Sequence, residues 1–197
     1  MAIATALHPE TLDLKRRQTL PKGQFWRIRE GLVRGLTWDE EGEAIALGLW
    51  GPGDIISSRL SSLNPFELET LSQTVIEAVD PQDLDLTTVL GQHFQATEQL
   101  LSITRTRLSE IRFSRLLEWL GRRFGIASQQ GYLVDLDRIY LTHQTLGELT
   151  GSTRVTITRL LNAFERQGVI TYERSRRMQI NISQLPHLSA HSQVQVA

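Results

Sequence analysis

Two short helical segments on either side of a glycine, between Thr142 and Gly168, constrain this chain more than any other feature. Thr142 has a side chain that caps helix starts, and Gly151 is a residue that readily ends a helix, so the first segment is predicted between them. The second segment begins at Arg154. At about 100° per residue, its apolar side chains fall on one side and its arginines on the other. The side expected to pack on the first helix contains Ile157, Leu160, Leu161 and Phe164.

Two helices joined by a turn of about three residues, the second with such divided faces, predict a helix-turn-helix. The second helix of this motif enters the DNA major groove and reads bases with its N-terminal residues. An arginine suits this task because its planar guanidinium can donate two hydrogen bonds to guanine, and valine and threonine methyl groups can touch a thymine methyl. We therefore expect base contacts from Arg154, Val155, Thr156, Thr158 and Arg159.

Phosphate contacts are expected from the helix starts and from a basic turn near the C-terminus. Hydroxyl groups and free backbone N–H groups at helix starts bind phosphates. Two strands are predicted around the turn from Arg174 to Arg177, and this strand pair is placed to act as a wing over the neighbouring DNA backbone. The expected phosphate-contacting residues are Thr142, His143, Gln144, Ser152, Thr153, Arg176 and Arg177.

A repeat of apolar residues at steps of four and three begins at Leu90 and predicts a long helix. The pattern predicts a bend near Phe113–Ser114 and then a second short helix that ends at Gly125. The repeat contains two threonines, where a purely structural seam usually has leucine or isoleucine. We favour pairing of this helix with a second copy of itself, and packing within one chain remains the alternative. The seam consists of Leu90, Phe94, Thr97, Leu101, Thr104, Leu108 and Ile111.

The N-terminal half predicts short strands. The segments "FWRIREGLVRGLTW" and "AIALGLWGPGDII" flank the acidic turn "DEEGE", which indicates a hairpin. Further along, "GYLVDLDRIYL" predicts a second, smaller hairpin. The expected division is a flexible arm over residues 1–12, a strand-rich sensor-like domain over 13–88, the long helix and hinge over 89–125, a winged helix-turn-helix over 126–182 and a mobile tail over 183–197.

Composition excludes several classes of protein. The chain has no cysteine, which removes disulfides, thiolate metal sites and iron–sulfur clusters. It has no apolar run of about 20 residues and no secretory leader, so a cytoplasmic protein without a membrane partner is expected. No P-loop and no metal-spaced cluster supports an enzyme. His187 and His191 are four residues apart, but they lie in a polar tail without an acidic partner, so no metal site is expected there.

The chain resembles the Crp/Fnr superfamily of bacterial transcription regulators. "LTHQTLGELTGSTRVTITRLLNAFERQGVI" is similar to the helix-turn-helix of the family, and "GSTRVT" with "TRLL" is most similar to the cyanobacterial global nitrogen regulators. "GLVRG" and "GPGDII" resemble two turns of the N-terminal β-roll of the family. The resemblance implies an α+β fold with a β-roll (a cyclic-nucleotide-binding-like jelly roll), a long dimerisation helix and a C-terminal winged helix-turn-helix.

The resemblance also implies a homodimer on double-stranded DNA, at a pseudo-palindrome with half-sites one helical turn apart. It implies base contacts from Arg154, Val155 and Arg159, and RNA polymerase as a further partner. In the catabolite-activator branch the position of Val155 holds a glutamate that reads cytosine. Valine cannot accept that hydrogen bond, so a different target is expected. The similarity to the global nitrogen regulators implies a GTA-N8-TAC palindrome as the first expectation.

The sensor half departs from the family pattern. After Gly53-Asp54 the segment "IISSRLSSLNPFELETL" lacks the Arg-Ser or Arg-Thr pair that clamps a cyclic phosphate, and Glu67 and Glu69 fall near the expected clamp, where like charge would oppose a phosphate. Cyclic AMP is therefore not expected. Neither is haem, because the lone His93 is a poor axial-ligand candidate, and no cofactor is expected. The candidate effector pocket contains Arg59, as an anion anchor or merely a surface arginine, together with Thr97, Leu100 and Leu101.

The leading hypothesis is a homodimeric, sequence-specific transcription regulator. The runner-up is a protein-interaction or sensor module whose winged helix has lost specific DNA binding. The two arginines of the second helix discriminate between them, because a protein-contact surface has no need of two arginines opposite an apolar stripe.

Overall fold

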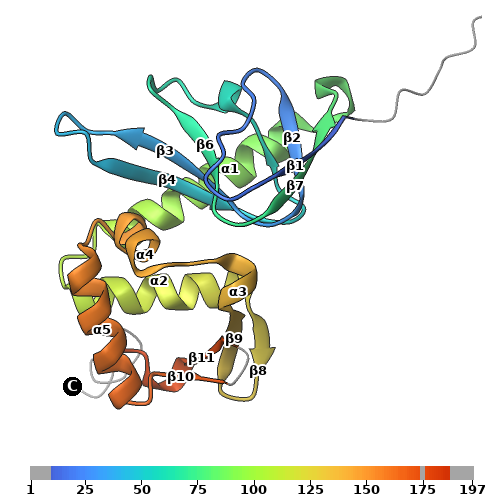
Figure 1. Cartoon of the computed structure of the whole chain (residues 1–197). Helices are drawn as coiled ribbons and strands as arrows, with labels where there is room; N and C mark the ends of the chain where they lie inside the picture. The colour runs from blue at the N-terminus through green and yellow to red at the C-terminus, as the bar shows by residue number, and fades with distance from the viewer. Residues whose placement is uncertain (1–9, 174–175, 187–197) are drawn as a thin grey trace, which may run out of the picture.

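The computed structural model describes residues 10–173 and 176–186, and Figure 1 shows a unit of strands above a unit of helices with a small sheet. The upper strands are β1 (Thr11–Leu14), β2 (Phe25–Glu30), β3 (Val33–Trp38), β4 (Ala44–Trp50), β5 (Ile55–Ile56), β6 (Glu67–Thr70) and β7 (Thr74–Val79). The helices are α1 (Leu86–Thr104), α2 (Ser109–Phe124), α3 (Leu136–Ile139), α4 (His143–Thr150) and α5 (Arg154–Arg166). The lower strands are β8 (Ile126–Ser128), β9 (Gly131–Asp135), β10 (Ile170–Tyr172) and β11 (Arg177–Asn181), and the short 3-10 turns are η1 (Ser58–Leu60), η2 (Pro81–Asp83) and η3 (Ile182–Gln184).

The upper unit is the expected β-roll. Its two antiparallel sheets have the strand orders β1-β7-β2-β5 and β4-β3-β6. Alternate side chains of these strands point inward and are removed from water, which is the main stabilising contribution of such a core. The core of the roll includes Trp26, Ile28, Val33, Trp50, Ile56 and Ile76, all nearly inaccessible to solvent.

The first predicted strand is divided in the structure. Gly31 interrupts it with a φ of 84°, a conformation that side chains other than glycine rarely adopt. A Cβ at this position would lie 2.3 Å from the carbonyl oxygen of Gln73, so the chain turns here only because no side chain is present. β2 therefore pairs with β7 in one sheet, whereas β3 pairs with β4 in the other. The hairpin around residues 39–43 has the expected acidic turn.

The long helix ends earlier than the repeat predicted. α1 stops at Thr104, and the break lies at residues 105–108 instead of at Phe113–Ser114, which are both buried inside α2. The hydroxyl groups of Thr104 and Thr106 donate to helix carbonyls one turn back, at 3.0 and 3.2 Å, and such bonds compete with the backbone ladder. Leu108 therefore precedes α2 as its N-cap, and Ile111 belongs to α2, so neither residue continues the seam of α1.

The lower unit is the expected winged helix-turn-helix. α2, α4 and α5 pack on a sheet with the strand order β10-β11-β9-β8. The small hairpin forms between β8 and β9, so its second strand is β9. The residues after β9, which were expected to form a strand, form the short helix α3 instead, because Asp135 caps its start. Among the described residues no helix is both long and apolar enough to cross a bilayer, and no group of three acidic or histidine side chains is suited to a metal ion.

Both ends of the fold extend further than expected. Thr11 and Leu12, assigned to the arm, form part of β1 and pair with β7. Leu185, assigned to the tail, is fully buried, since η3 turns it into the lower core. Residues 1–9 and 187–197, including His187 and His191, lie outside the described residues, as do residues 174–175 of the basic turn.

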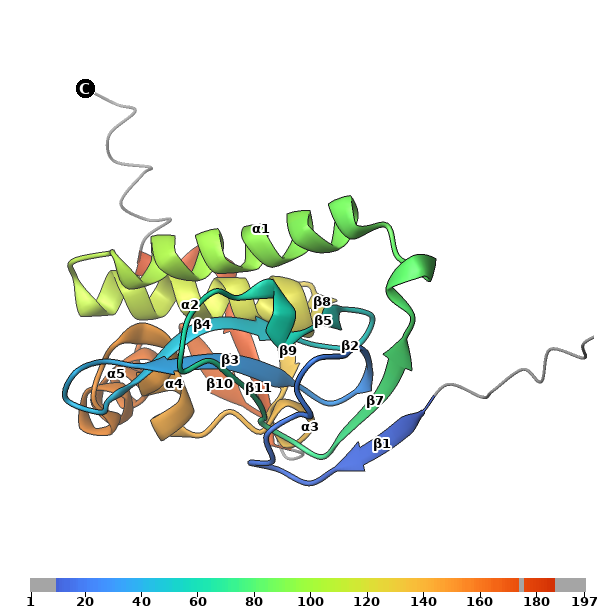
Figure 2. The ribbon, with the colours of Figure 1, turned by 90° about the horizontal axis from the view of Figure 1, so that it is seen from above.

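The two units share one apolar core. Leu32, Leu49 and Leu71 of the β-roll belong to the same buried cluster as the apolar residues of α2 and α5. Figure 2 shows α1 lying along the outer edge of the molecule, with α2 and the strands of the roll both on its inner side. The orientation of the lower unit is therefore set by burial as well as by polar contacts.

Candidate nucleic-acid interface

The turn between α4 and α5 has the geometry of a helix-turn-helix. The Thr142 hydroxyl accepts a hydrogen bond from the Thr145 N–H at 3.1 Å and caps α4. Gly151 ends α4 with a φ of 60°, and Thr153 caps α5 by accepting from the Thr156 N–H at 3.2 Å. The predicted helix starts and the glycine stop are confirmed.

α5 divides into the two expected faces. Ile157, Leu160, Leu161 and Phe164 are buried. On the opposite side Val155 is 78% exposed, and Arg154 and Arg159 are exposed without an ion-pair partner among the described residues. A shallow hollow on this side is lined by Arg154, Val155, Thr158, Arg159, Asn162 and Arg166.

Asn162 and Arg166 were missed by the sequence reasoning. The same angular spacing places both on the arginine side of the helix, so the signal was present in the sequence. The C-terminal position of Arg166, three turns from the helix start, suits a DNA phosphate better than a base, since base readout is concentrated at the start of the recognition helix.

Two threonines of α5 have their hydroxyl groups already engaged. The Thr158 hydroxyl lies 2.8 Å from His143 Nδ1 and donates to the Arg154 carbonyl at 3.0 Å. The Thr156 hydroxyl lies 3.0 Å from that of Thr153. The methyl groups are therefore the parts of these side chains left for the expected base contact.

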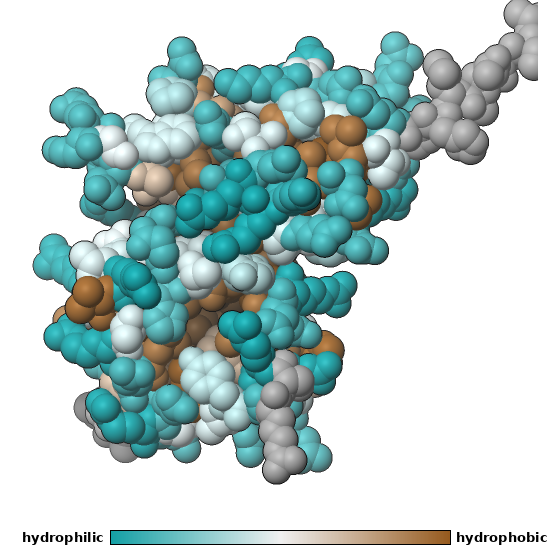
Figure 3. Space-filling model, viewed as in Figure 1, coloured by the Kyte–Doolittle hydropathy of each residue, from teal (hydrophilic) through white to brown (hydrophobic). Residues whose placement is uncertain are grey.

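The predicted phosphate residues divide into three places. Thr142, His143, Gln144 and Arg176 line one groove with Arg154, and Figure 3 shows the surface hollowed between the two units on this side. Tyr172 lines the same groove, and burial, assisted by the nearby charge of Glu165, raises its pKa. Ser152 and Thr153 instead line a hollow against β4 and α1, and Ser152 accepts a bond from Arg112 at 3.3 Å. Arg177 stands apart at the start of β11, 4.0 Å from Asp135.

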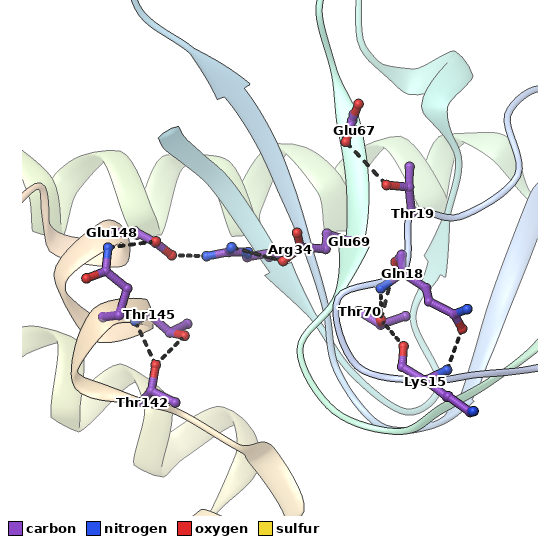
Figure 4. A network of polar contacts seen from close by, with 11 residues as sticks. Lys15, Gln18, Thr19, Arg34, Glu67, Glu69, Thr70, Thr142, Thr145 and Glu148 are labelled. Atoms are coloured by element: carbon purple, nitrogen blue, oxygen red, sulfur yellow. Dashed lines mark hydrogen bonds and ion pairs between the residues drawn. The ribbon is translucent and has the colours of Figure 1, made fainter. Parts of the chain in front are cut away.

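Arg34 links this interface to the β-roll. It projects from β3 toward α4, and its guanidinium contacts Glu69 at 2.9 Å and also pairs with Glu148 of α4 (Figure 4). The Arg34 side chain is only 7% exposed. Glu148 in turn accepts from Gln144 at 3.0 Å, so one expected phosphate contact is connected to the sensor-like unit through two side chains.

The structure corrects the argument about Glu67 and Glu69. Both side chains point away from the interior of the roll, because they alternate along β6 with the buried Leu68 and Thr70. Glu67 accepts from Thr19 at 3.3 Å, and Glu69 pairs with Arg34 (Figure 4). These carboxylates therefore do not oppose a phosphate inside the roll.

Arg59 is not brought together with the other residues of the candidate effector pocket. Arg59 lies on η1, over the ring of Phe25 at 5.9 Å, and lines a hollow at the far end of the roll. Thr97, Leu100 and Leu101 line the hollow between the two units. His93 stacks on Trp50 and bonds to the Ile55 carbonyl oxygen at 3.0 Å, and burial lowers its pKa. His93 therefore has a structural environment.

The seam of α1 faces outward. Leu90, Phe94 and Leu101 are 52%, 66% and 57% exposed, whereas Val89, Ala96, Leu100 and Ile103 on the other side are buried in the chain. Large apolar side chains aligned on one side of a helix and left in water mark an interaction surface. Packing within the chain does not account for these residues.

Comparisons with known proteins agree with this geometry. The Crp-like helix-turn-helix domain matches residues 112–190. The regulatory protein CysR of Synechococcus elongatus is 49% identical over 164 residues, which cover 82% of this chain and 80% of that protein. The global nitrogen regulator of the same species is 32% identical over 109 residues, 55% of this chain and 47% of that protein.

Solved structures share the fold across both units. FixK2 from Bradyrhizobium japonicum has a TM-score of 0.74 at 16% identity, covering 91% of this chain and 96% of that chain. A CRP-family transcriptional regulator from Thermus thermophilus has a TM-score of 0.68 at 22% identity, covering 94% of this chain and 97% of that chain. The similarity therefore includes the β-roll, the long helix and the winged helix-turn-helix.

Proposed function

The chain belongs to the Crp/Fnr superfamily of DNA-binding transcription regulators, and from this membership we propose that it acts as a homodimer on a pseudo-palindromic DNA site. It is a regulator and not an enzyme, like the relatives it matches. Its place of action is then the cytoplasm, at the chromosome, with RNA polymerase as a further partner.

The observation that carries the proposal is the exposed side of α5. Arg154 and Arg159 are exposed on a helix whose other side is buried, and neither has an ion-pair partner within the part of the chain that the structure describes. Val155 lies between them in water. In the major groove the two guanidinium groups donate to guanine edges, and the Val155 methyl groups lie against a thymine. The helix starts and the basic side chains around this surface hold phosphates and fix its register on the duplex.

Dimerisation is assigned to α1. The exposed seam now consists of Leu90, Phe94, Thr97, Leu101 and Thr104, since the helix ends before Leu108 and Ile111. Two copies of this helix side by side bury these side chains and place two recognition helices in successive major grooves, about 34 Å apart. The wing residue Arg177 then adds a sequence-independent backbone contact.

The sensor-like unit takes a small molecule other than cyclic AMP, or none. Wherever Glu67 and Glu69 point, the segment after Gly53-Asp54 lacks an Arg-Ser or Arg-Thr pair for a cyclic phosphate. The stretch of α1 that faces the roll is apolar at Leu100.

Fluorescence anisotropy tests the proposal. The purified protein is titrated on a duplex carrying GTA-N8-TAC and on a scrambled duplex across a salt series, with and without 2-oxoglutarate or cyclic AMP. Salt-dependent binding to the palindrome alone supports a specific regulator and its half-site. Equal weak binding to both duplexes removes the GTA-N8-TAC assignment and leads to random-sequence selection. No binding to any duplex favours the protein-interaction reading.

A further inference from the structure

A basic turn of the β-roll lies against the DNA-binding surface. Lys15, Arg16 and Arg17 follow β1 directly, and none of them has an ion-pair partner among the described residues. Arg16 and Arg17 line the same groove as Thr142, His143, Gln144, Arg154 and Arg176. We propose that this turn contacts the phosphates of DNA flanking the half-site, so that the DNA is bound by both units of the chain.

The turn is held in one conformation. The buried Thr70 donates to the Lys15 carbonyl oxygen at 2.6 Å and accepts from the Gln18 N–H at 3.0 Å, as Figure 4 shows. The Lys15 N–H donates to Gln18 Oε1 at 2.6 Å, and Arg17 sits at a φ of 61° with its N–H bonded to the Thr70 carbonyl at 2.8 Å. Because these hydrogen bonds already order the backbone of the turn, little conformational entropy is lost there when DNA binds, and this favours binding.

Arg16 ties the turn to the lower unit. Its guanidinium lies 4.3 Å from the ring centre of Tyr140, which lies between α3 and α4. Its Nε is buried and has no hydrogen-bond partner among the described residues. A buried N–H donor without an acceptor is unfavourable. An anion that reaches the groove would therefore stabilise the Arg16 guanidinium.

The charges around the turn favour an anion. Among the described residues that line the groove, four arginines face one carboxylate, Glu173, and Arg176 is paired with Asp137 at 3.2 Å. The hollow on the other side of Arg16 contains Lys15 and Arg138 against Glu30 and Asp137, together with Arg29, which is paired with Glu77. The excess of basic side chains around the turn is local, because the whole chain has a net charge of −1. A row of cations continuous with the recognition surface fits the evenly spaced charges of duplex DNA.

The inference rests on the proposed function, so the test separates the two. Binding is measured on a short duplex that ends at the half-sites and on a duplex extended by about one helical turn on each side. The site is the palindrome or, where selection returns another sequence, that sequence. If the wild-type protein does not prefer the site to a scrambled duplex, the proposed function fails before this inference is tested.

The test variant is Arg16→Gln/Arg17→Gln. On the extended duplex we expect an affinity loss of at least about tenfold at low salt and a salt dependence shallower by about one unit per lost phosphate contact. On the short duplex we expect wild-type affinity. Arg16→Lys/Arg17→Lys keeps the charges and is expected to retain the salt dependence.

Lys22→Ala/Arg122→Ala is the matched control, since it removes two exposed cations outside the groove. It should bind both duplexes as the wild type does. Wild-type binding of the glutamine variant to the extended duplex at every salt concentration would overturn the inference. An equal loss on both duplexes would also overturn it, because the turn would then act through the fold and not through the flanks.

Discussion

Replacing Arg34 with methionine perturbs the contact that joins the β-roll to α4. The side chain of Arg34 is 7% exposed, and those of Glu69 and Glu148 are 20% and 18% exposed. Methionine leaves two carboxylates facing each other without the cation that bridges them. Removing one member of a buried ion pair lowers the free energy of unfolding by about 3–5 kcal/mol. Because Glu69 and Glu148 are partly exposed, we expect a loss of about 3 kcal/mol for Arg34→Met.

Urea unfolding followed by circular dichroism measures the effect. With a denaturant slope near 3 kcal/mol per molar, a loss of about 3 kcal/mol lowers the midpoint by about 1 M. Arg34→Met/Glu69→Gln/Glu148→Gln removes the uncompensated charges as well, and we expect it to regain at least half of that shift. The matched control is Arg29→Met, which breaks an exposed pair and should leave the midpoint nearly unchanged.

Two results would refute this reasoning. A midpoint for Arg34→Met within about 0.2 M of the wild type would mean that the acids are solvated well enough to need no cation. A triple variant as unstable as the single variant would mean that the loss comes from packing of the arginine stem and not from unpaired charge.

Three further predictions address the interface, the dimer and the sensor-like unit. Arg159→Ala should weaken binding to the specific duplex by about 1–3 kcal/mol and relax the preference at one base position, whereas Arg177→Ala should weaken binding to specific and random duplexes alike. If anisotropy shows the same pattern for both variants, the division into base and phosphate contacts is wrong. Phe94→Glu/Leu101→Glu should halve the mass in sedimentation equilibrium, and an unchanged dimer mass would contradict the seam. Because burial lowers the pKa of His93, the unfolded chain binds the proton more readily, so stability should fall as the pH drops below about 6.5. His93→Gln, which keeps a donor for Ile55, should flatten that fall in urea midpoints measured from pH 7 to 5.

Local signals in the sequence were sufficient for the DNA-binding motif. Helix caps depend on residues within one turn, and the faces of α5 follow from its spacing alone, so Thr142, Gly151 and the arginine side were predictable. The same spacing also places Asn162 and Arg166 on the arginine side, so these two residues were predictable as well. The β-roll was predictable from its glycine turns through the family resemblance, since those turns mark where strands must reverse.

The tertiary structure decided what depends on contacts between distant segments. The end of α1 was misplaced because an apolar repeat runs across a helix break without changing its period, whereas the threonine hydroxyls and the burial of Phe113 set the break. The direction of Glu69 depends on which side of β6 meets the core. Arg34 pairs with both Glu69 and Glu148, and the Arg34–Glu148 pair joins residues 114 positions apart. The position of Arg16 and Arg17 beside the helix-turn-helix likewise follows from the docking of the two units, because no local pattern brings a turn after β1 next to α4.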